Sequence, residues 1–108
     1  MKRMTLEQFN TQVLQSEKPV LLEFTGSFCP GCSAMERVLY PLECEYGESI
    51  SFLEVNADQE EMLNTLLHVQ TLPATFLFHN GKILEQHRGF WPKNELEAVI
   101  KDALSNGE

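Results

Sequence analysis

The sequence contains little cysteine, with three residues in a chain of 108. Small secreted domains that depend on disulfides for stability have dense, even sets of cysteines instead. With 43% hydrophobic residues, the chain is long enough to bury a core without covalent cross-links. A purely structural disulfide is therefore disfavoured, and we predict a single domain over residues 1–108.

Long apolar runs are also missing. No segment approaches the roughly 20 apolar residues of a membrane-spanning helix. The short basic start, MKR, is not followed by the apolar stretch that a signal peptide requires. We expect a soluble, cytoplasmic protein, unless a signal peptide was removed.

Basic residues are few, with 8 Lys and Arg against 16 Asp and Glu, so the formal net charge is −8. Nucleic acids and anionic membranes attract proteins of the opposite charge. We therefore expect neither as a partner. Internal repeats, low-complexity tracts and linkers are absent as well.

The hydrophobic pattern alternates between helical and strand periodicity along the chain. Helices are predicted over residues 5–16, 30–46, 60–69 and 94–104, and strands at VLLEF (20–24), ISFLEVNAD (50–58) and on both sides of Asn80-Gly81. Thr5 is expected to cap the first helix. Pro41 should kink or break the second, which Gly47 ends. Asp58 and Glu61 resemble a capping box for the third.

This order of elements predicts an α/β fold with a central mixed sheet of four to five strands and helices on both faces. The first part of the sheet should be parallel, and the final hairpin should add antiparallel strands.

The stretch FCPGCS, residues 28–33, places two cysteines where a buried strand ends and a helix begins. Cys29 would lie beside unpaired backbone N–H groups at the positive end of the helix dipole, which stabilises a thiolate. Pro30 suits the first helical position. The two-residue spacer lets the sulfurs bond. We predict Cys29 as the nucleophile and Cys32 as the resolving thiol.

The cysteines also allow a metal-binding interpretation. In it, Cys29 and Cys32 form half of a zinc site, which Cys44 completes with one of the histidines His68, His79 or His87. A continuous helix would, however, separate Cys44 from Cys32 by about 18 Å. Cys44 falls off the apolar face of its helix, so we expect an incidental thiol, with a redox or dimerising role as the alternative.

The segments FCPGC after VLLEF, then VNAD, TLPATFLF, NGK and RG resemble the thioredoxin family over nearly the whole chain. The resemblance implies the thioredoxin fold and a cis proline at Pro73 facing the disulfide. It also implies that the backbone of Leu72 pairs with substrate and that Gly89 lines the same groove. A trans Pro73 opening an edge strand and a simple turn role for Gly89 are the alternatives.

The chain departs from this family at several positions. Phe28 stands where tryptophan is usual, and the spacer Pro30-Gly31 reverses the usual Gly-Pro order, which leaves the redox potential open. Glu23 aligns with the family's buried aspartate, which handles protons for the inner cysteine. Glu54 aligns with its accompanying lysine. Two carboxylates would then face one another, unless one of them points outward.

The resemblance implies a protein dithiol–disulfide oxidoreductase that reduces protein disulfides and receives electrons from a reductase of the thioredoxin-reductase type. No bound cofactor or metal is expected beyond the redox-active disulfide, and we expect a monomer. The predicted catalytic residues are Cys29, Cys32 and Glu23, with Glu54 behind them. The predicted substrate-binding residues are Phe28, Pro30, Gly31, Leu72, Pro73, Gly89 and Trp91. Trp91 either flanks the groove or packs over the last helix.

Alternative functions remain at this stage. The proline-first spacer is compatible with a glutaredoxin-like protein or with an oxidising or isomerase-type protein of the same fold. An interaction module with inactive cysteines and a metal-binding protein are less favoured.

Overall fold

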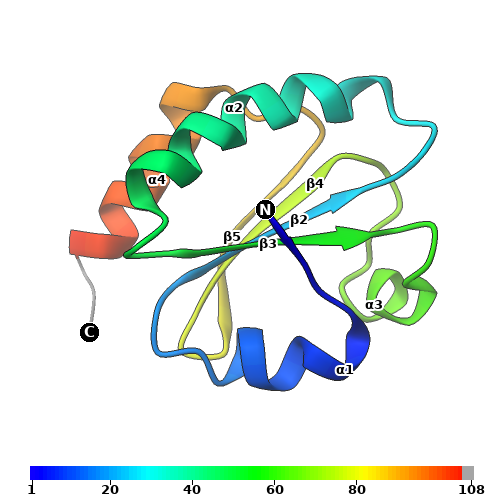
Figure 1. Ribbon diagram of the computed structural model, residues 1–108, viewed down its shortest axis with the longest axis horizontal. Helices are drawn as coiled ribbons and strands as arrows, with labels where there is room; N and C mark the ends of the chain where they lie inside the picture. The colour runs from blue at the N-terminus through cyan, green and yellow to red at the C-terminus, as the bar shows by residue number, and fades with distance from the viewer. Residues whose placement is uncertain (106–108) are drawn as a thin grey trace.

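Five strands form one mixed sheet in the computed structural model, which describes residues 1–105 (Figure 1). The spatial order is β1 (Lys2–Arg3), β3 (Ser51–Asn56), β2 (Val20–Thr25), β4 (Ala74–His79) and β5 (Lys82–Arg88). Strands β1, β3 and β2 are parallel, whereas β4 and β5 are antiparallel to their neighbours. The predicted mixed sheet is confirmed. Residues 106–108 of the predicted domain lie outside the described residues.

Helices cover both faces of this sheet (Figure 1). On one face lie α1 (Leu6–Phe9), its continuation η1 (Asn10–Leu14) and α3 (Glu61–Leu66). On the other lie α2 (Pro30–Tyr46) and α4 (Lys93–Ser105). The elements are therefore arranged in three layers, as the alternation of periodicities predicts.

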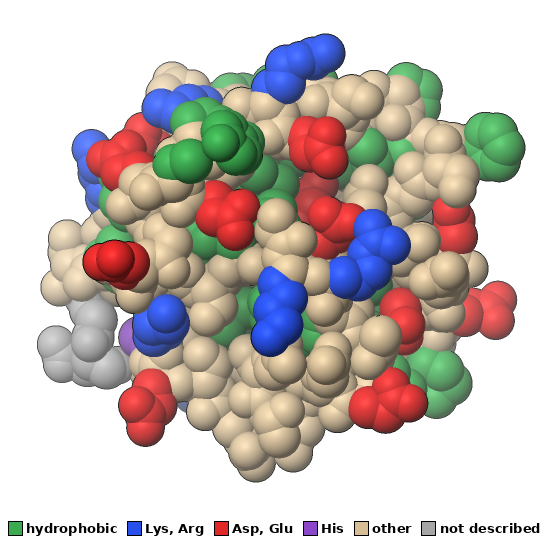
Figure 2. Space-filling view, viewed as in Figure 1, with side chains coloured by type: hydrophobic (Ala, Val, Ile, Leu, Met, Phe, Trp, Pro, Cys, Tyr) green, Lys and Arg blue, Asp and Glu red, His purple; other side chains and the backbone are tan. Residues whose placement is uncertain are grey.

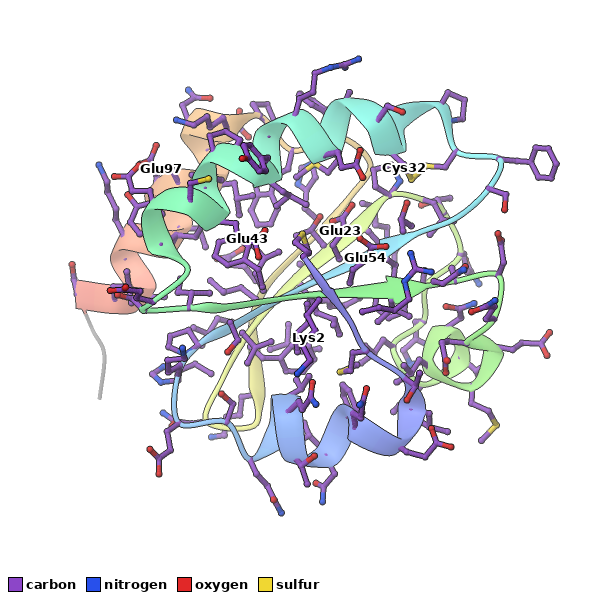
Figure 3. The ribbon with its side chains drawn as sticks, in the orientation of Figure 1. Lys2, Glu23, Cys32, Glu43, Glu54 and Glu97 are labelled. Carbon is purple, nitrogen blue, oxygen red and sulfur yellow. A yellow bond between two sulfur atoms is a disulfide. The ribbon has the colours of Figure 1, made fainter. Side chains whose placement is uncertain are left out.

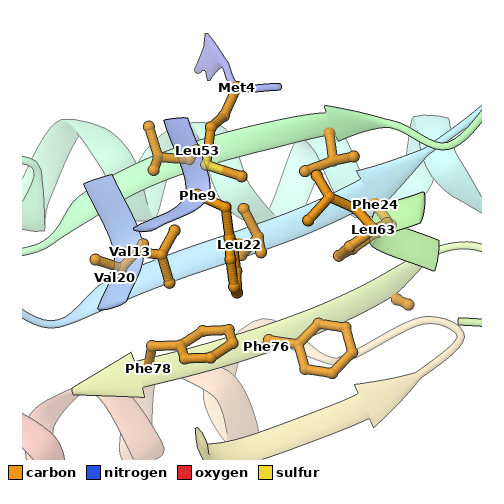
Figure 4. Close-up of a cluster of buried hydrophobic side chains, with 12 residues drawn as sticks. Met4, Phe9, Val13, Val20, Leu22, Phe24, Leu53, Leu63, Phe76 and Phe78 are labelled. Atoms are coloured by element: carbon orange, nitrogen blue, oxygen red, sulfur yellow. The ribbon is translucent and has the colours of Figure 1, made fainter. Parts of the chain in front are cut away.

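Alternating side chains on each strand divide the core into two clusters. In β2, Leu22 and Phe24 pack toward α1 and α3, together with Phe76 and Phe78 of β4 (Figure 4). Leu21, which precedes Leu22 on β2, packs with residues of α2 and α4. Because Glu23 and Leu21 are two positions apart, Glu23 points to the α2 face as well.

The first helix differs from its prediction. It changes after Phe9 into a π-helical segment, η1, which ends at Leu14 rather than at Ser16. Phe9 and Val13 are both buried, so the wider turn still presents these two apolar residues to the core. The side chain of Gln8 accepts a hydrogen bond from the backbone N–H of Thr5 at 3.0 Å, at the predicted start.

The second helix is not broken at Pro41. α2 continues from Pro30 to Tyr46, with Pro41 exposed on its outer side. Buried residues on both sides of the proline, including Leu39 and Leu42, hold the helix against the core. This packing offsets the backbone hydrogen bond that a proline inside a helix removes.

The hairpin prediction is confirmed, whereas the capping box of the third helix is wrong. Asn80 and Gly81 have φ values of 56° and 76°, which a tight turn between β4 and β5 requires. Helix α3 begins at Glu61 after Glu60 rather than at Asp58. The Asp58 carboxylate is occupied elsewhere, by hydrogen bonds from Ser27.

Among the helices within residues 1–105, none has the length and apolar character needed to cross a bilayer.

Candidate active site

The two cysteines of the FCPGCS stretch form a disulfide at the start of α2. Cys29 occupies the N-cap position and Pro30 the first helical position, as predicted. The backbone N–H of Cys32 donates to the carbonyl of Cys29 at 3.1 Å, which closes the first turn around the pair. Proline gives up no hydrogen bond at this position. The sequence thus builds a helix start whose first turn is the redox-active ring.

Solvent exposure does not distinguish the nucleophile from the resolving thiol, because both cysteines are half-buried. Their positions on the helix distinguish them. Cys29 lies at the N-cap, next to the positive end of the helix dipole, whereas Cys32 lies within the first turn. The dipole therefore favours a thiolate at Cys29.

Three residues from distant parts of the chain meet beside the disulfide. The Leu72–Pro73 peptide bond is cis, as predicted. A Cβ atom at Gly31 would lie 3.2 Å from Cδ of Pro73, so Gly31 lies directly against the proline ring. The N–H of Gly89 donates to the carbonyl of Pro73 at 2.7 Å. Gly31, Pro73 and Gly89 thus form one contiguous surface, in which the two glycines are half-buried and the proline is buried.

Gly89 also has open space around it. Its φ is +84°, which L side chains rarely adopt, and a Cβ there would meet nothing within 4 Å. The position follows the end of β5, as the turn interpretation expects, and it also lies beside Pro73, as the groove interpretation expects. A glycine here satisfies both.

Apolar side chains of different exposure surround this surface. Phe28 is 100% exposed and has no packing role in the fold. Leu72 is half-buried and packs against the α1 side of the core. Trp91 is only 4% exposed, and its ring stacks on His87 at a centroid distance of 4.8 Å. Burial favours the packing role of Trp91, whereas the ring of Phe28 is open to solvent.

The loop that carries Phe28 is anchored by a residue that the sequence pattern did not identify. The backbone N–H and the hydroxyl of Ser27 donate to Oδ2 of Asp58, at 2.9 and 2.6 Å. These hydrogen bonds lower the pKa of Asp58 below its usual range. A Cβ at Gly26 would lie 2.8 Å from Cδ1 of Leu72 and 3.1 Å from Oδ1 of Asp58, so a larger residue there would require these side chains to shift. Contacts between segments this far apart leave no local signal in the sequence.

Glu23 is a buried carboxyl group on the α2 face of the sheet. It is 4% exposed, and the hydroxyl of Thr75 donates to its Oε1 at 2.6 Å. The pKa of Glu23 is raised to about 8: burial is the largest cause, the Thr75 hydrogen bond opposes it, and the nearby Glu54 adds a smaller increase. Glu23 can therefore bind or release a proton near neutral pH.

Glu54 lies next to Glu23 and does not point to the opposite face. The two residues are register partners on the parallel strands β2 and β3, so their side chains project to the same side (Figure 3). The side chain of Glu54 is 20% exposed and forms an ion pair with Arg3 of β1. Glu23 and Glu54 thus lie together, as predicted, and Arg3 adds a cation that the sequence pattern did not indicate.

No three His, Cys, Asp or Glu side chains gather into a metal-binding arrangement within residues 1–105. Cys44 is a free, exposed thiol on α2, twelve residues beyond Cys32 along an unbroken helix. The donor set that the zinc interpretation requires is thus not assembled in the described part of the chain.

The chain was compared with protein families and with curated proteins. Residues 1–102 match the family described as Thioredoxin. A thioredoxin from Alicyclobacillus acidocaldarius subsp. acidocaldarius is 30% identical over 102 residues, which cover 94% of this chain and 97% of that protein. Thioredoxin C-2 from Corynebacterium nephridii is 31% identical, over 89% of each chain. Thioredoxin Y, chloroplastic, from Oryza sativa subsp. japonica is 28% identical, and the match covers 95% of this chain and 61% of that longer protein.

Proposed function

Because the chain belongs to the thioredoxin family and is a thiol–disulfide oxidoreductase, we propose that it reduces disulfides in protein substrates through Cys29 and Cys32. The observation that carries the proposal is the Cys29–Cys32 disulfide at the N-terminus of α2, beside the surface formed by Gly31, Pro73 and Gly89. A helix start stabilises the attacking thiolate, and the open space beside Gly89 leaves room for an extended substrate segment.

In the first step of the proposed reaction, the Cys29 thiolate attacks one sulfur of the substrate disulfide. A mixed disulfide forms between Cys29 and the substrate, and the other substrate sulfur leaves as a thiolate. Phe28, Pro30 and the backbone of Leu72 contact the substrate in this complex, together with Gly31, Pro73 and Gly89. Trp91 supports this surface from within the core.

In the second step, Cys32 resolves the mixed disulfide. Its thiol gives a proton to Glu23 and attacks the sulfur of Cys29, and the second substrate sulfur leaves as a thiolate. Two electrons have then passed from the dithiol to the substrate, and the Cys29–Cys32 disulfide is formed. A reductase of the thioredoxin-reductase type would restore the dithiol.

Several further properties belong to this proposal. We expect one domain over residues 1–108 that acts as a monomer in the cytoplasm, takes part in electron transport and needs no bound cofactor besides its disulfide. The net charge of −8 supports the expectation that nucleic acids and anionic membranes are not its partners.

Reduction of insulin in the presence of dithiothreitol tests the proposed activity. We expect the protein to accelerate the precipitation of the released insulin chains in proportion to its concentration. Rates equal to those with dithiothreitol alone would show that the cysteine pair does not reduce protein disulfides.

Replacing Phe28 with Ala should weaken the reduction of protein substrates without affecting the fold. The ring is 100% exposed, so its removal costs no core packing, whereas its partial burial against a substrate is worth about 1 kcal/mol. We expect KM for a protein disulfide to rise about 3- to 10-fold. Steady-state kinetics with insulin would measure the change.

Tyr40→Ala is the matched control, because Tyr40 is an aromatic residue on α2 that is 70% exposed and remote from the disulfide. It should leave KM unchanged. If both variants had the same KM as the wild type, Phe28 would be no part of the substrate-binding surface.

A further inference from the structure

A row of polar residues crosses all five strands of the sheet in register. Arg3 of β1 pairs with Glu54 of β3, and Glu54 pairs with Glu23 of β2. Glu23 pairs in turn with Thr75 of β4, and Thr75 with His87 of β5. We call these five residues the cross-strand row. Register partners project to the same face, which here is the face covered by α2 and α4.

The contacts within the cross-strand row run from the core toward the β1 edge. Glu23 is 4% exposed and accepts a hydrogen bond from the neutral hydroxyl of Thr75. The side chain of Glu54 is 20% exposed, and that of Arg3, which pairs with it, is 53% exposed. Among these contacts, no cation pairs with the carboxyl group of Glu23 itself. The guanidinium group of Arg3 pairs with the neighbouring Glu54 instead. Figure 3 shows Glu23 and Glu54 together on this face.

Resting on the proposed role of Glu23, we propose that Arg3 is a positioning residue for the second step of the reaction: by pairing with Glu54 it offsets the negative charge next to Glu23. Without Arg3, the Glu54 carboxylate would act on Glu23 uncompensated. A like charge beside a buried carboxyl group favours the protonated form. Glu23 would then accept the Cys32 proton only at higher pH.

The burial of Glu23 strengthens this coupling. Charges near a buried group are screened less than charges in water. A change of one charge beside Glu54 therefore changes the pKa of Glu23. The raised pKa of Glu23 has its largest cause in burial, and Glu54 adds to it in the same direction. Arg3, on the exposed edge strand of the cross-strand row, limits the effect of the Glu54 charge on the pKa of Glu23.

Other charged or titratable groups face this region from the elements around it. They are Cys29, Cys32, Glu36, Arg37, Tyr40 and Glu43 on α2, the amino group of Met1, which pairs with Glu43, Asp58 in the loop after β3, and His87 on β5. Acidic and basic side chains lie close together on the side of the molecule that carries the N-terminal strand (Figure 2). All of these groups remain in variants of Arg3, so a comparison with the wild type isolates the arginine.

Lys2 provides a matched control for Arg3. It is the neighbouring basic residue of the same strand, it is exposed, and by alternation it points to the opposite face of the sheet (Figure 3). Removing its charge changes the net charge by the same amount as removing that of Arg3. Only Arg3 is in register with Glu54.

The test is an NMR titration of the Glu23 carboxyl carbon in the reduced full-length protein, with the resonance assigned by its loss in Glu23→Gln. We expect Arg3→Gln to raise the midpoint of Glu23 by about 0.5 to 1 pH unit. Arg3→Lys should restore the wild-type midpoint, because it restores the charge, and Lys2→Gln should leave it unchanged. The pH dependence of mixed-disulfide release should move upward with the midpoint in Arg3→Gln.

An unchanged midpoint in Arg3→Gln, or an equal shift in Lys2→Gln, would overturn this inference. Failure of the proposed function has a different signature: mixed-disulfide release would proceed at the wild-type rate in Glu23→Gln, whatever the titrations of the Arg3 variants show.

Discussion

Glu23→Gln should stabilise the oxidised protein at pH 9 by on the order of 4 kcal/mol relative to the wild type, while the two proteins should be nearly equal in stability at pH 4. Burial raises the pKa of Glu23 from 4.5 to about 8. One unit of pKa difference between the folded and unfolded states corresponds to about 1.4 kcal/mol. Glutamine resembles the protonated acid and still accepts the Thr75 hydrogen bond, so the variant loses little at low pH.

The direction of the pH dependence follows from proton binding. Between pH 4.5 and about 8, the folded state retains the proton of Glu23 and the unfolded state has released it. The free energy of unfolding therefore decreases as the pH rises through this window. The Gln variant lacks this loss.

Chemical denaturation at pH 5, 7 and 9 would measure the difference. Glu17→Gln is the control, because it removes the same charge from an exposed carboxylate in the loop before β2, away from Glu23. If wild type and Glu23→Gln showed the same decrease between pH 5 and 9, Glu23 would not titrate in this window.

The same substitution should impair catalysis although it stabilises the fold. Without a carboxyl group to accept the Cys32 proton, release of the mixed disulfide should slow by about 10- to 100-fold. The attack by Cys29 should keep its rate, because it needs no proton acceptor at Glu23. Single-turnover kinetics with a fluorescent disulfide substrate would separate the two steps.

Cys32→Ser should reduce multiple-turnover reduction of insulin by more than about 10³-fold and accumulate a covalent complex with the substrate. Cys29 keeps its position at the start of α2, so the first step proceeds. The resolving thiol is gone, so the mixed disulfide persists. Non-reducing electrophoresis and mass spectrometry would detect the complex.

Two further variants complete this experiment. Cys29→Ser should lose the activity and form no complex, which would assign the nucleophile. Both variants should be made with Cys44 replaced by Ser, because Cys44 is a free, exposed thiol that can itself exchange with disulfides. A complex formed by Cys29→Ser and not by Cys32→Ser would reverse the roles.

The sequence predicted the main features of the fold because they depend on local patterns. The short apolar run VLLEF and the alternation in ISFLEVNAD identified strands β2 and β3, and Asn80-Gly81 identified the hairpin. The position of Cys29 followed from the junction between a strand and a helix. The resemblance to thioredoxin supplied the cis bond before Pro73, which no periodicity indicates.

The remaining features depend on contacts between distant segments. Arg3 lies on a strand of two residues, too short to show any alternation, and meets Glu54 only once the sheet is assembled. Asp58 has the spacing of a helix cap, but its carboxylate binds Ser27 instead. The continuity of α2 through Pro41 depends on packing, which overrides the local preference of proline.

The central claim is that Cys29 and Cys32 act as a reductant of protein disulfides. Equilibration of the pair with defined mixtures of oxidised and reduced dithiothreitol would measure its reduction potential directly. We expect a value below about −230 mV, close to the roughly −270 mV of thioredoxin. A value of about −180 mV or higher, in the range of isomerases and oxidants, would contradict the claim, because such a pair takes up electrons from protein thiols instead of donating them.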